Sequence, residues 1–188
     1  MKKVILSVLL VAAIAIANAQ QVQFGIKAGV NVASWTGSDA DNSKSKIGFN
    51  AGALVNIPVS GGFSVQPELM YSGQGAKEEG TDSKANLDYL NIPVMAKYTF
   101  TGGFFAETGP QIGFLLSAKV DGVDLKDQFK STDFAWGLGV GYQSSVGIGG
   151  GVRYNYGFSK LDKDGQLKAY NGVFQVGIHY MFGVNSSK

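Results

Sequence analysis

The fold is decided by a stretch near the N-terminus, VQFGIKAGVNV at residues 22–32, in which apolar residues alternate with polar or small ones. A strict period of two indicates a β-strand, because successive side chains of a strand point to opposite faces. One face of this strand is therefore apolar, and the other carries glycine, amide side chains and Lys27.

The same period recurs along the rest of the chain and predicts eight strands. They span residues 22–32, 47–59, 63–73, 90–100, 104–116, 134–142, 146–158 and 170–182. Leu87 and Tyr89 precede the fourth strand in the opposite phase to Leu90, which predicts a bulge or a kink near its upper end.

The connections between these strands alternate in length. Four are long and polar, and three are short: Thr36–Lys46, Gln74–Asn86, Lys119–Ser131 and Lys160–Ala169 against Ser60–Gly62, Thr101–Gly103 and Gln143–Ser145. Tight turns at one end and long loops at the other are typical of outer-membrane barrels. The predicted fold is all-β, an eight-stranded antiparallel up-and-down transmembrane β-barrel over residues 20–188.

The first 19 residues predict export. Lys2 and Lys3 are followed by an apolar run from Val4 to Ile16, and Ala17-Asn18-Ala19 has the small-residue pattern of a cleavage site. This is the layout of a secretory signal peptide, and the run is shorter than the roughly 20 residues of a membrane-spanning helix. We therefore expect a signal peptide at residues 1–19, cleavage after Ala19 and localisation in the outer membrane.

Alternation alone leaves a soluble, lipocalin-like barrel as the alternative, with the apolar face inside. Two features favour an apolar face that meets lipid. The polar face is mostly Gly, Asn, Gln and Ser, with few charges, whereas a wet outer face would carry many. The apolar face places aromatic residues near both strand ends, as in the interfacial girdles of membrane barrels: Phe63, Tyr98, Phe100, Phe104, Tyr142, Tyr180 and Phe182 at the turn end, and Phe49, Tyr71, Trp136, Tyr156, Phe158 and Tyr170 at the loop end.

The charges of the polar face are balanced and predict a neutralising network inside the barrel, because unpaired charges are costly in an enclosed space. His179 lies on the same face as these charges. The predicted interior polar network comprises Lys27, Glu68, Lys97, Glu107, Asp133, Arg153 and His179.

Composition excludes several kinds of chemistry. There is no cysteine, so disulfides and thiolate sites are excluded, and His179 is the only histidine. Without Lys2 and Lys3, the 16 basic residues fall to the number of acidic ones, 14, which argues against nucleic-acid binding. The glycine-rich run at 147–151 lacks the strand-to-helix context of a phosphate loop, and the acidic runs at 39–42 and 162–165 do not complete a calcium loop. We predict no metal and no cofactor.

The chain resembles a known family in three runs: LDYLNIPVMAKY at 87–98, ETGPQIGFLL at 107–116 and WGLGVGY at 136–142. They are similar to the outer-membrane β-barrel domain family of Bacteroidota, whose members are described as porin-family or PorT-like proteins. The resemblance implies an eight-stranded barrel inserted by the barrel-assembly machinery, and it carries no shared catalytic residue.

The function predicted from these features is non-enzymatic, a structural or surface-interaction role through the four long loops. The predicted partners are outer-membrane lipid, the assembly machinery and a surface or envelope protein. The alternatives are a PorT-like component of a secretion or envelope-assembly complex, a lipid A-modifying enzyme with His179 as its base, and a narrow pore. Eight strands enclose an interior that side chains can fill, which argues against the pore.

Overall fold

The protein was studied as a computed structural model, which describes residues 22–183. The predicted signal peptide and its cleavage after Ala19 lie outside these residues. None of the helices in the described part of the chain has the length and hydropathy to cross a membrane.

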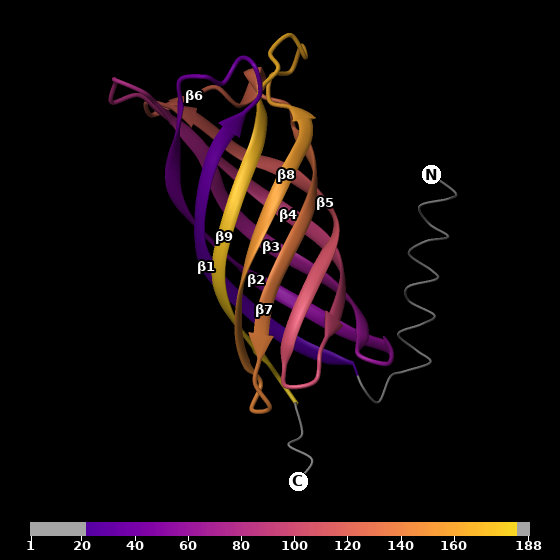
Figure 1. Ribbon diagram of the computed structural model, residues 1–188. Helices are drawn as coiled ribbons and strands as arrows, with labels where there is room; N and C mark the ends of the chain where they lie inside the picture. The colour runs from indigo at the N-terminus through magenta and orange to yellow at the C-terminus, as the bar shows by residue number, and fades with distance from the viewer. Residues whose placement is uncertain (1–21, 184–188) are drawn as a thin grey trace, which may run out of the picture.

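The described chain folds into one antiparallel sheet that closes on itself (Figure 1). Its strands are β1 (Gln23–Thr36), β2 (Ser43–Ser60), β3 (Phe63–Glu78), β4 (Lys84–Thr99), β5 (Phe104–Val120), β6 (Val123–Asp124), β7 (Thr132–Gln143), β8 (Ile148–Lys160) and β9 (Tyr170–Met181), with a short 3-10 helix at Lys126–Gln128. Each strand of the wall pairs with its neighbour in sequence, and β9 returns to pair with β1 from Gly25↔Met181 to Thr36↔Tyr170. The two-residue β6 turns back and pairs only with the last residues of β5, so the barrel has eight strands, as predicted.

The short connections lie at the end of the barrel where both described chain ends are found (Figure 1). They need glycine because their backbone enters the left-handed region, with φ of 55° and 88° at Gly61 and Gly62 and of 93° and 91° at Gly102 and Gly103. The long connections gather at the opposite end, which we call the loop end.

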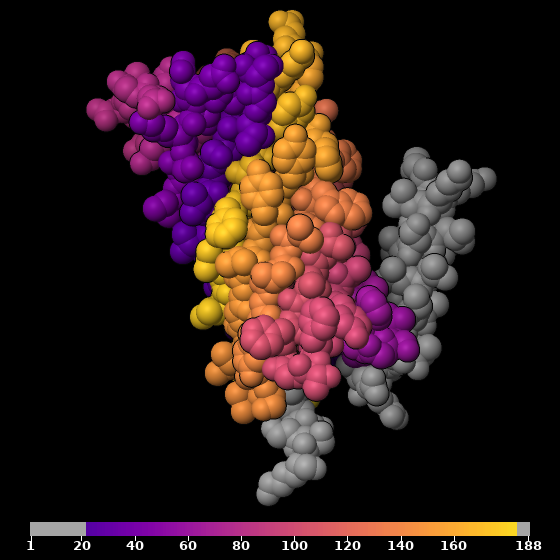
Figure 2. All heavy atoms as spheres, in the orientation of Figure 1, coloured from indigo at the N-terminus to yellow at the C-terminus, as the bar shows by residue number. Residues whose placement is uncertain are grey.

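Apolar side chains cover the outside of the barrel, and polar ones fill the inside. On β9, Ile178 is 70% exposed, whereas its neighbour His179 is 8% exposed. In Figure 2 the side chains of β5, β7 and β8 cover the outer wall that faces the viewer. This arrangement is the reverse of a lipocalin-like barrel and confirms the lipid-facing interpretation.

The predicted aromatic girdles are visible as contacts between rings. At the turn end, Tyr98 lies between Phe63 and Phe100, with ring centroids 4.5 and 4.8 Å apart. At the loop end, Phe49 contacts Tyr71 at 5.0 Å, on adjacent strands. Aromatic rings that pack against one another near both ends of a barrel suit the two interfaces of a bilayer.

The strands are longer than predicted at the loop end. β2 begins at Ser43, β3 continues to Glu78, and β4 begins at Lys84, so much of the predicted loops 36–46 and 74–86 is paired sheet. The apolar alternation ends where the outer face leaves the lipid, but the hydrogen-bonded ladder continues. The sequence pattern therefore marks the part of each strand in the membrane, not the full strand.

The bulge predicted from Leu87 and Tyr89 was assigned to the wrong strand. β4 keeps its alternation, and Leu87 and Tyr89 both point inward and are fully buried. The register shift at this height lies between Asp88↔Ser117 and Tyr89↔Leu115, so the extra residue is in β5. The phase changes in the sequence because the upper interior is apolar, whereas the middle of the interior is polar.

Candidate functional site

A buried ion cluster lies at the centre of the barrel and is organised by Arg153 of β8. Its Nη1 and Nη2 donate to the two carboxylate oxygens of Glu68 at 2.8 and 2.6 Å, and its Nε donates to Oε1 of Glu107 at 2.7 Å. All three residues are buried. The guanidinium fork thus joins two strands, β3 and β5, across the interior to β8.

Two lysines flank this cluster on the same level. Lys27 Nζ lies 3.8 Å from Oε2 of Glu68. Lys97 Nζ lies 3.4 Å from Oε1 of Gln66 and 3.9 Å from the centre of the Phe105 ring. The structure thus brings together five of the seven predicted interior residues.

The other two predicted residues lie elsewhere in the interior. His179 is nearer the turn end, where its ring bonds to Oε1 of Gln143 and packs edge-on against Phe105. Asp133 lies nearer the loop end, where Oδ2 accepts a hydrogen bond from Asn171 Nδ2 at 3.1 Å. Neither residue contacts Arg153, so the interior is built in layers and not as one network.

A layer of uncharged polar groups above Arg153 was not among the predicted site residues. Asn31 is its centre: Nδ2 donates to Ser72 Oγ at 3.0 Å, and Oδ1 accepts from Asn50 and Gln175 at 2.6 and 3.1 Å. All four side chains lie on the polar faces found in the sequence, but only the closed barrel shows that the four strands bring them to one level.

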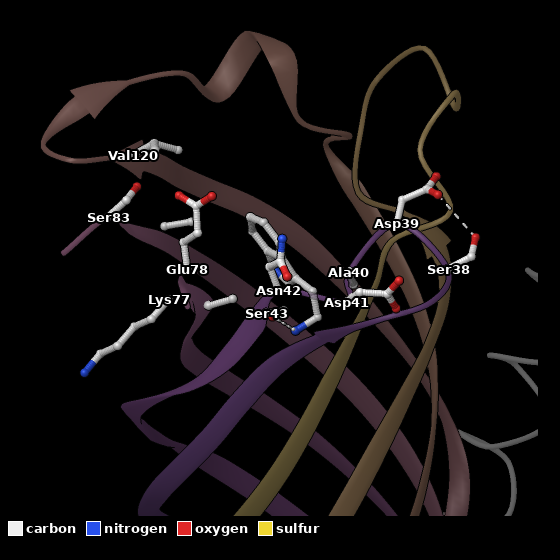
Figure 3. Close-up of a pocket in the computed structure, with 13 residues that line it drawn as sticks. Ser38, Asp39, Ala40, Asp41, Asn42, Ser43, Lys77, Glu78, Ser83 and Val120 are labelled. Carbon is white, nitrogen blue, oxygen red and sulfur yellow. Dashed lines mark hydrogen bonds between the residues drawn. The ribbon is translucent and has the colours of Figure 1, made fainter. Parts of the chain in front are cut away.

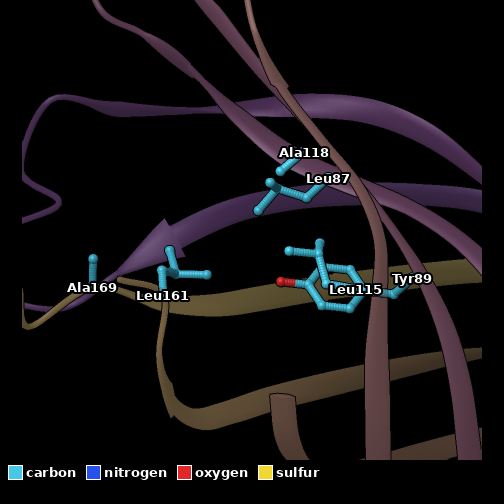
Figure 4. Close-up of a cluster of buried hydrophobic side chains, with 6 residues drawn as sticks. All are labelled: Leu87, Tyr89, Leu115, Ala118, Leu161 and Ala169. Carbon is cyan, nitrogen blue, oxygen red and sulfur yellow. The ribbon is translucent and has the colours of Figure 1, made fainter. Parts of the chain in front are cut away.

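The loop end of the interior is closed by apolar side chains (Figure 4). We call this cluster the plug; it consists of Leu87, Tyr89, Leu115, Ala118, Leu161 and Ala169. Leu161 and Ala169 come from the β8–β9 loop and fold back into the barrel. Below the plug, a cavity between the ion cluster and His179 measures about 20 Å³, room for one water molecule.

Three loops are tied together above the plug. Lys130 N–H donates to the Leu161 carbonyl at 2.8 Å, and Lys163 N–H donates to the Gln128 carbonyl at 2.9 Å. Asp39 accepts the N–H of Lys168 at 2.8 Å. The β1–β2, β5–β7 and β8–β9 loops therefore form one connected cap.

A cavity of about 500 Å³ opens between this cap and the β3–β4 hairpin (Figure 3). We call it the loop-end cavity. Trp35, Ala40, Ala76, Ala85 and Val120 supply its apolar surface, and the polar residues Ser38, Asp39, Asp41, Asn42, Ser43, Lys77, Glu78 and Ser83 complete its lining. The hairpin is held over the cavity by the N–H of Glu79, which donates to the Asn42 carbonyl at 2.9 Å.

The charges beside this cavity are mostly negative. Figure 3 shows the carboxylates of Asp39, Asp41 and Glu78 around it, whereas the side chain of Lys77 points away. At its edge, the N–H of Lys84 and the hydroxyl of Ser83 donate to Asp121, which lowers the pKa of that carboxyl. The indole Nε1 of Trp35 is buried and has no hydrogen-bond partner among the described residues.

Within residues 22–183, no three histidine or carboxylate side chains converge on a point where they could hold a metal ion. The acidic residues of the loop-end cavity do not converge on one point as the ligands of a metal ion do. Asp39, for example, is already used by Ser38 and the Lys168 N–H.

The sequence profile of the family described as "Outer membrane protein beta-barrel domain" matches residues 18–163. The chain belongs to this family. Membership in the outer membrane protein beta-barrel domain family agrees with the lipid-facing wall and the girdles and places the barrel in the outer membrane, as predicted. A comparison with curated protein sequences gave no match.

Two solved structures show the fold of this outer membrane protein beta-barrel domain. Ail, the attachment invasion locus protein of Yersinia pestis, was solved in complex with the heparin analogue sucrose octasulfate. It is 18% identical over 86% of this chain and 99% of its own, with a TM-score of 0.54. Neisserial surface protein A is 18% identical over 85% of this chain and 97% of its own, with a TM-score of 0.54.

Proposed function

We propose that this protein is a non-enzymatic recognition protein of the outer-membrane surface that binds a partner protein through the loop-end cavity. The observation that carries the proposal is the contrast in free space between the loops above the plug and the interior below it. The loop-end cavity measures about 500 Å³, within the range of about 300–1,000 Å³ typical of binding pockets. The cavity within the barrel measures about 20 Å³.

The lining of the loop-end cavity fits a basic side chain of a surface or envelope protein. Lysine and arginine combine an aliphatic stem with a charged end. The stem would pack on Trp35, Ala76 and Val120, and the charge would bond to Asp41 and Glu78. The sulfated sugar analogue bound to Ail carries the opposite charge, so this cavity calls for a different kind of ligand.

The position of His179 supports a non-enzymatic role. A catalytic base must reach its substrate within about 3 Å, directly or through one water molecule. His179 is buried on the inward face of β9, bonded to Gln143. The acyl chains of lipid A would lie against the apolar outward face. No cofactor is part of the proposal.

Binding of an oligolysine peptide to the full chain in lipid nanodiscs tests the proposal. Asp41→Asn with Glu78→Gln should weaken binding by about tenfold or more, since each charge-assisted bond contributes about 1.5–3 kcal/mol. Asp127→Asn with Asp164→Asn makes the same change in net charge on exposed loop positions and is the matched control.

Equal loss of binding in both double variants would contradict the proposal, because it would mean that only net charge matters. Crosslinking in intact membranes addresses the PorT-like alternative. If partners crosslink at the turns Ser60–Gly62 or Thr101–Gly103 and not at the loop end, a role in a secretion or envelope-assembly complex replaces the proposal.

A further inference from the structure

Three lysines lie in register on neighbouring strands just below the β3–β4 hairpin tip. Lys44 of β2 is directly opposite Lys77 of β3, and Lys77 is directly opposite Lys84 of β4. Like charges directly opposite each other destabilise a sheet. Lys46 lies close enough to Lys77 and Lys84 to be affected by their charges. We call these four residues the lysine row.

Few negative groups face the lysine row. Glu79 is 2.7 Å from Lys44, in a pair that is 57% exposed on both sides. Asp88 lies near Lys46 and accepts a hydrogen bond from the Tyr71 hydroxyl at 2.8 Å. Asp121 accepts the Lys84 N–H at 2.8 Å and lies near the Lys84 charge. Four lysines against these three carboxylates leave a net charge of +1.

Three members of the row, Lys44, Lys77 and Lys84, belong to the outer face of the wall. Lys46 is opposite the buried Ala33 and donates to the Gln74 carbonyl at 3.1 Å. Ala76 and Ala85 are buried toward the inside, and the next residues along the strands, Lys77 and Lys84, are exposed on the other face. Figure 3 shows the Lys77 side chain directed away from the loop-end cavity and from Glu78. The amines of the lysine row therefore point away from the proposed partner site, although Lys77 borders both.

The row begins just beyond the loop-end girdle. Lys46 is three residues before Phe49 on β2, and Lys77 is six residues after Tyr71 on β3. At about 3.3 Å per residue these steps are about 10 and 20 Å along tilted strands, and lysine side chains can reach back toward the membrane. On strands tilted by about 35–45° these steps rise roughly 7–8 and 14–16 Å. The amines thus lie from the level of the polar headgroups, which add about 5–8 Å to each side of the hydrocarbon core, to just above it.

We propose that the lysine row binds the phosphate groups of a phosphorylated glycolipid in the outer leaflet. A phosphate between opposed lysines neutralises the repulsion that the sheet otherwise retains, and ammonium groups are common ligands of phosphate. The lipid is held against the wall by the girdle below and by the row above. This site uses charges other than the carboxylates of the partner site in the loop-end cavity.

The test compares lipid A carrying two phosphates with monophosphoryl lipid A, each titrated into neutral detergent micelles that contain the full chain. The thermal unfolding midpoint reports binding, and inorganic phosphate is titrated separately. The variant is Lys44→Gln/Lys77→Gln/Lys84→Gln. The control, Lys126→Gln/Lys163→Gln/Lys168→Gln, removes the same charge from exposed loop positions.

We expect lipid A with two phosphates to stabilise the wild-type and control proteins at lower concentrations than monophosphoryl lipid A. In the lysine-row variant the apparent affinity should fall about fivefold per lysine, on the order of 100-fold in total. Without lipid, this variant should unfold at the same or a higher temperature than wild type, because repulsion is removed.

Two results would overturn the proposal. The first is an equal response to lipid A in the lysine-row variant and in the wild-type protein. The second is equal stabilisation by inorganic phosphate alone, which would assign the row to free phosphate and not to a lipid. Loss of oligolysine binding in the cavity variants has no bearing on either result, so the two proposals fail separately.

Discussion

Gly149 on β8 faces the interior, where the ring of His179 occupies the space that a side chain would need. Gly150, the next residue, faces outward, and a methyl group there would meet only the Gly177 carbonyl at 3.2 Å and an Ile178 methyl group at 3.7 Å. We expect Gly149→Ala to destabilise the barrel by about 1–3 kcal/mol through overpacking, and Gly150→Ala to have a much smaller effect. Urea unfolding in detergent measures both, and equal stability of the two variants would contradict the packing seen around His179.

Replacing Arg153 should cause the largest loss of stability among the charge substitutions. Arg153→Met leaves Glu68 and Glu107 buried and close together, and removing one partner of a buried ion pair costs about 3–5 kcal/mol. Adding Glu68→Gln and Glu107→Gln together with Lys27→Met and Lys97→Met should restore much of this stability, since no charge of the cluster is then left unpaired. Lys163→Met, in an exposed loop, is the control and should change little.

Equal stability of these variants would contradict the electrostatic explanation of the Arg153 prediction. If the variant with all five substitutions is no more stable than Arg153→Met, the loss comes from the shape of the arginine side chain and not from its charge. Band shift on unheated detergent gels separates failure to fold from a lower unfolding midpoint.

At the scale of whole strands, the sequence predicted the order, the pairing and the inward face of each strand. It did so because lipid imposes a period of two on the outer face of every strand. The same reasoning missed the paired extensions at residues 43–46, 74–78 and 84–89, where water wets the outer face and that constraint is absent. The loop-end cavity was missed for a related reason. Trp35, Glu78, Ala85 and Val120 come from four separate strands, and no local pattern predicts their meeting.

The β8–β9 loop offers a test of the plug. Leu161 is 6% exposed, whereas Leu167 in the same loop is 51% exposed. Leu161→Ala should release the loop by removing about 2–5 kcal/mol of buried contact, and Leu167→Ala should not. Limited proteolysis of the folded protein should therefore cut residues 160–169 faster in the first variant only. Equal cleavage rates would show that backbone bonds alone hold the cap.

For the whole molecule, the layers of side chains that fill the interior predict that the barrel does not conduct ions steadily. The plug and the Arg153 cluster block the interior at two levels in series. In planar bilayers we expect no stable conductance steps from the wild-type protein, and none from Leu161→Ala, because the lower block remains. Regular steps from the wild-type protein would instead support the narrow-pore alternative.

The pairing of β1 with β9 also determines which step of folding comes last. All other neighbours in the barrel wall are consecutive in the chain, but this seam joins Ile26 to Tyr180 and ends where the Phe182 N–H meets the Phe24 carbonyl at 2.7 Å. Contacts of such high sequence separation form late, since most of the chain must already be in place. Until then the sheet has two open edges, which attract other strands. A chain truncated before β9 should therefore aggregate through these edges, whereas a chain shortened in a loop can still close.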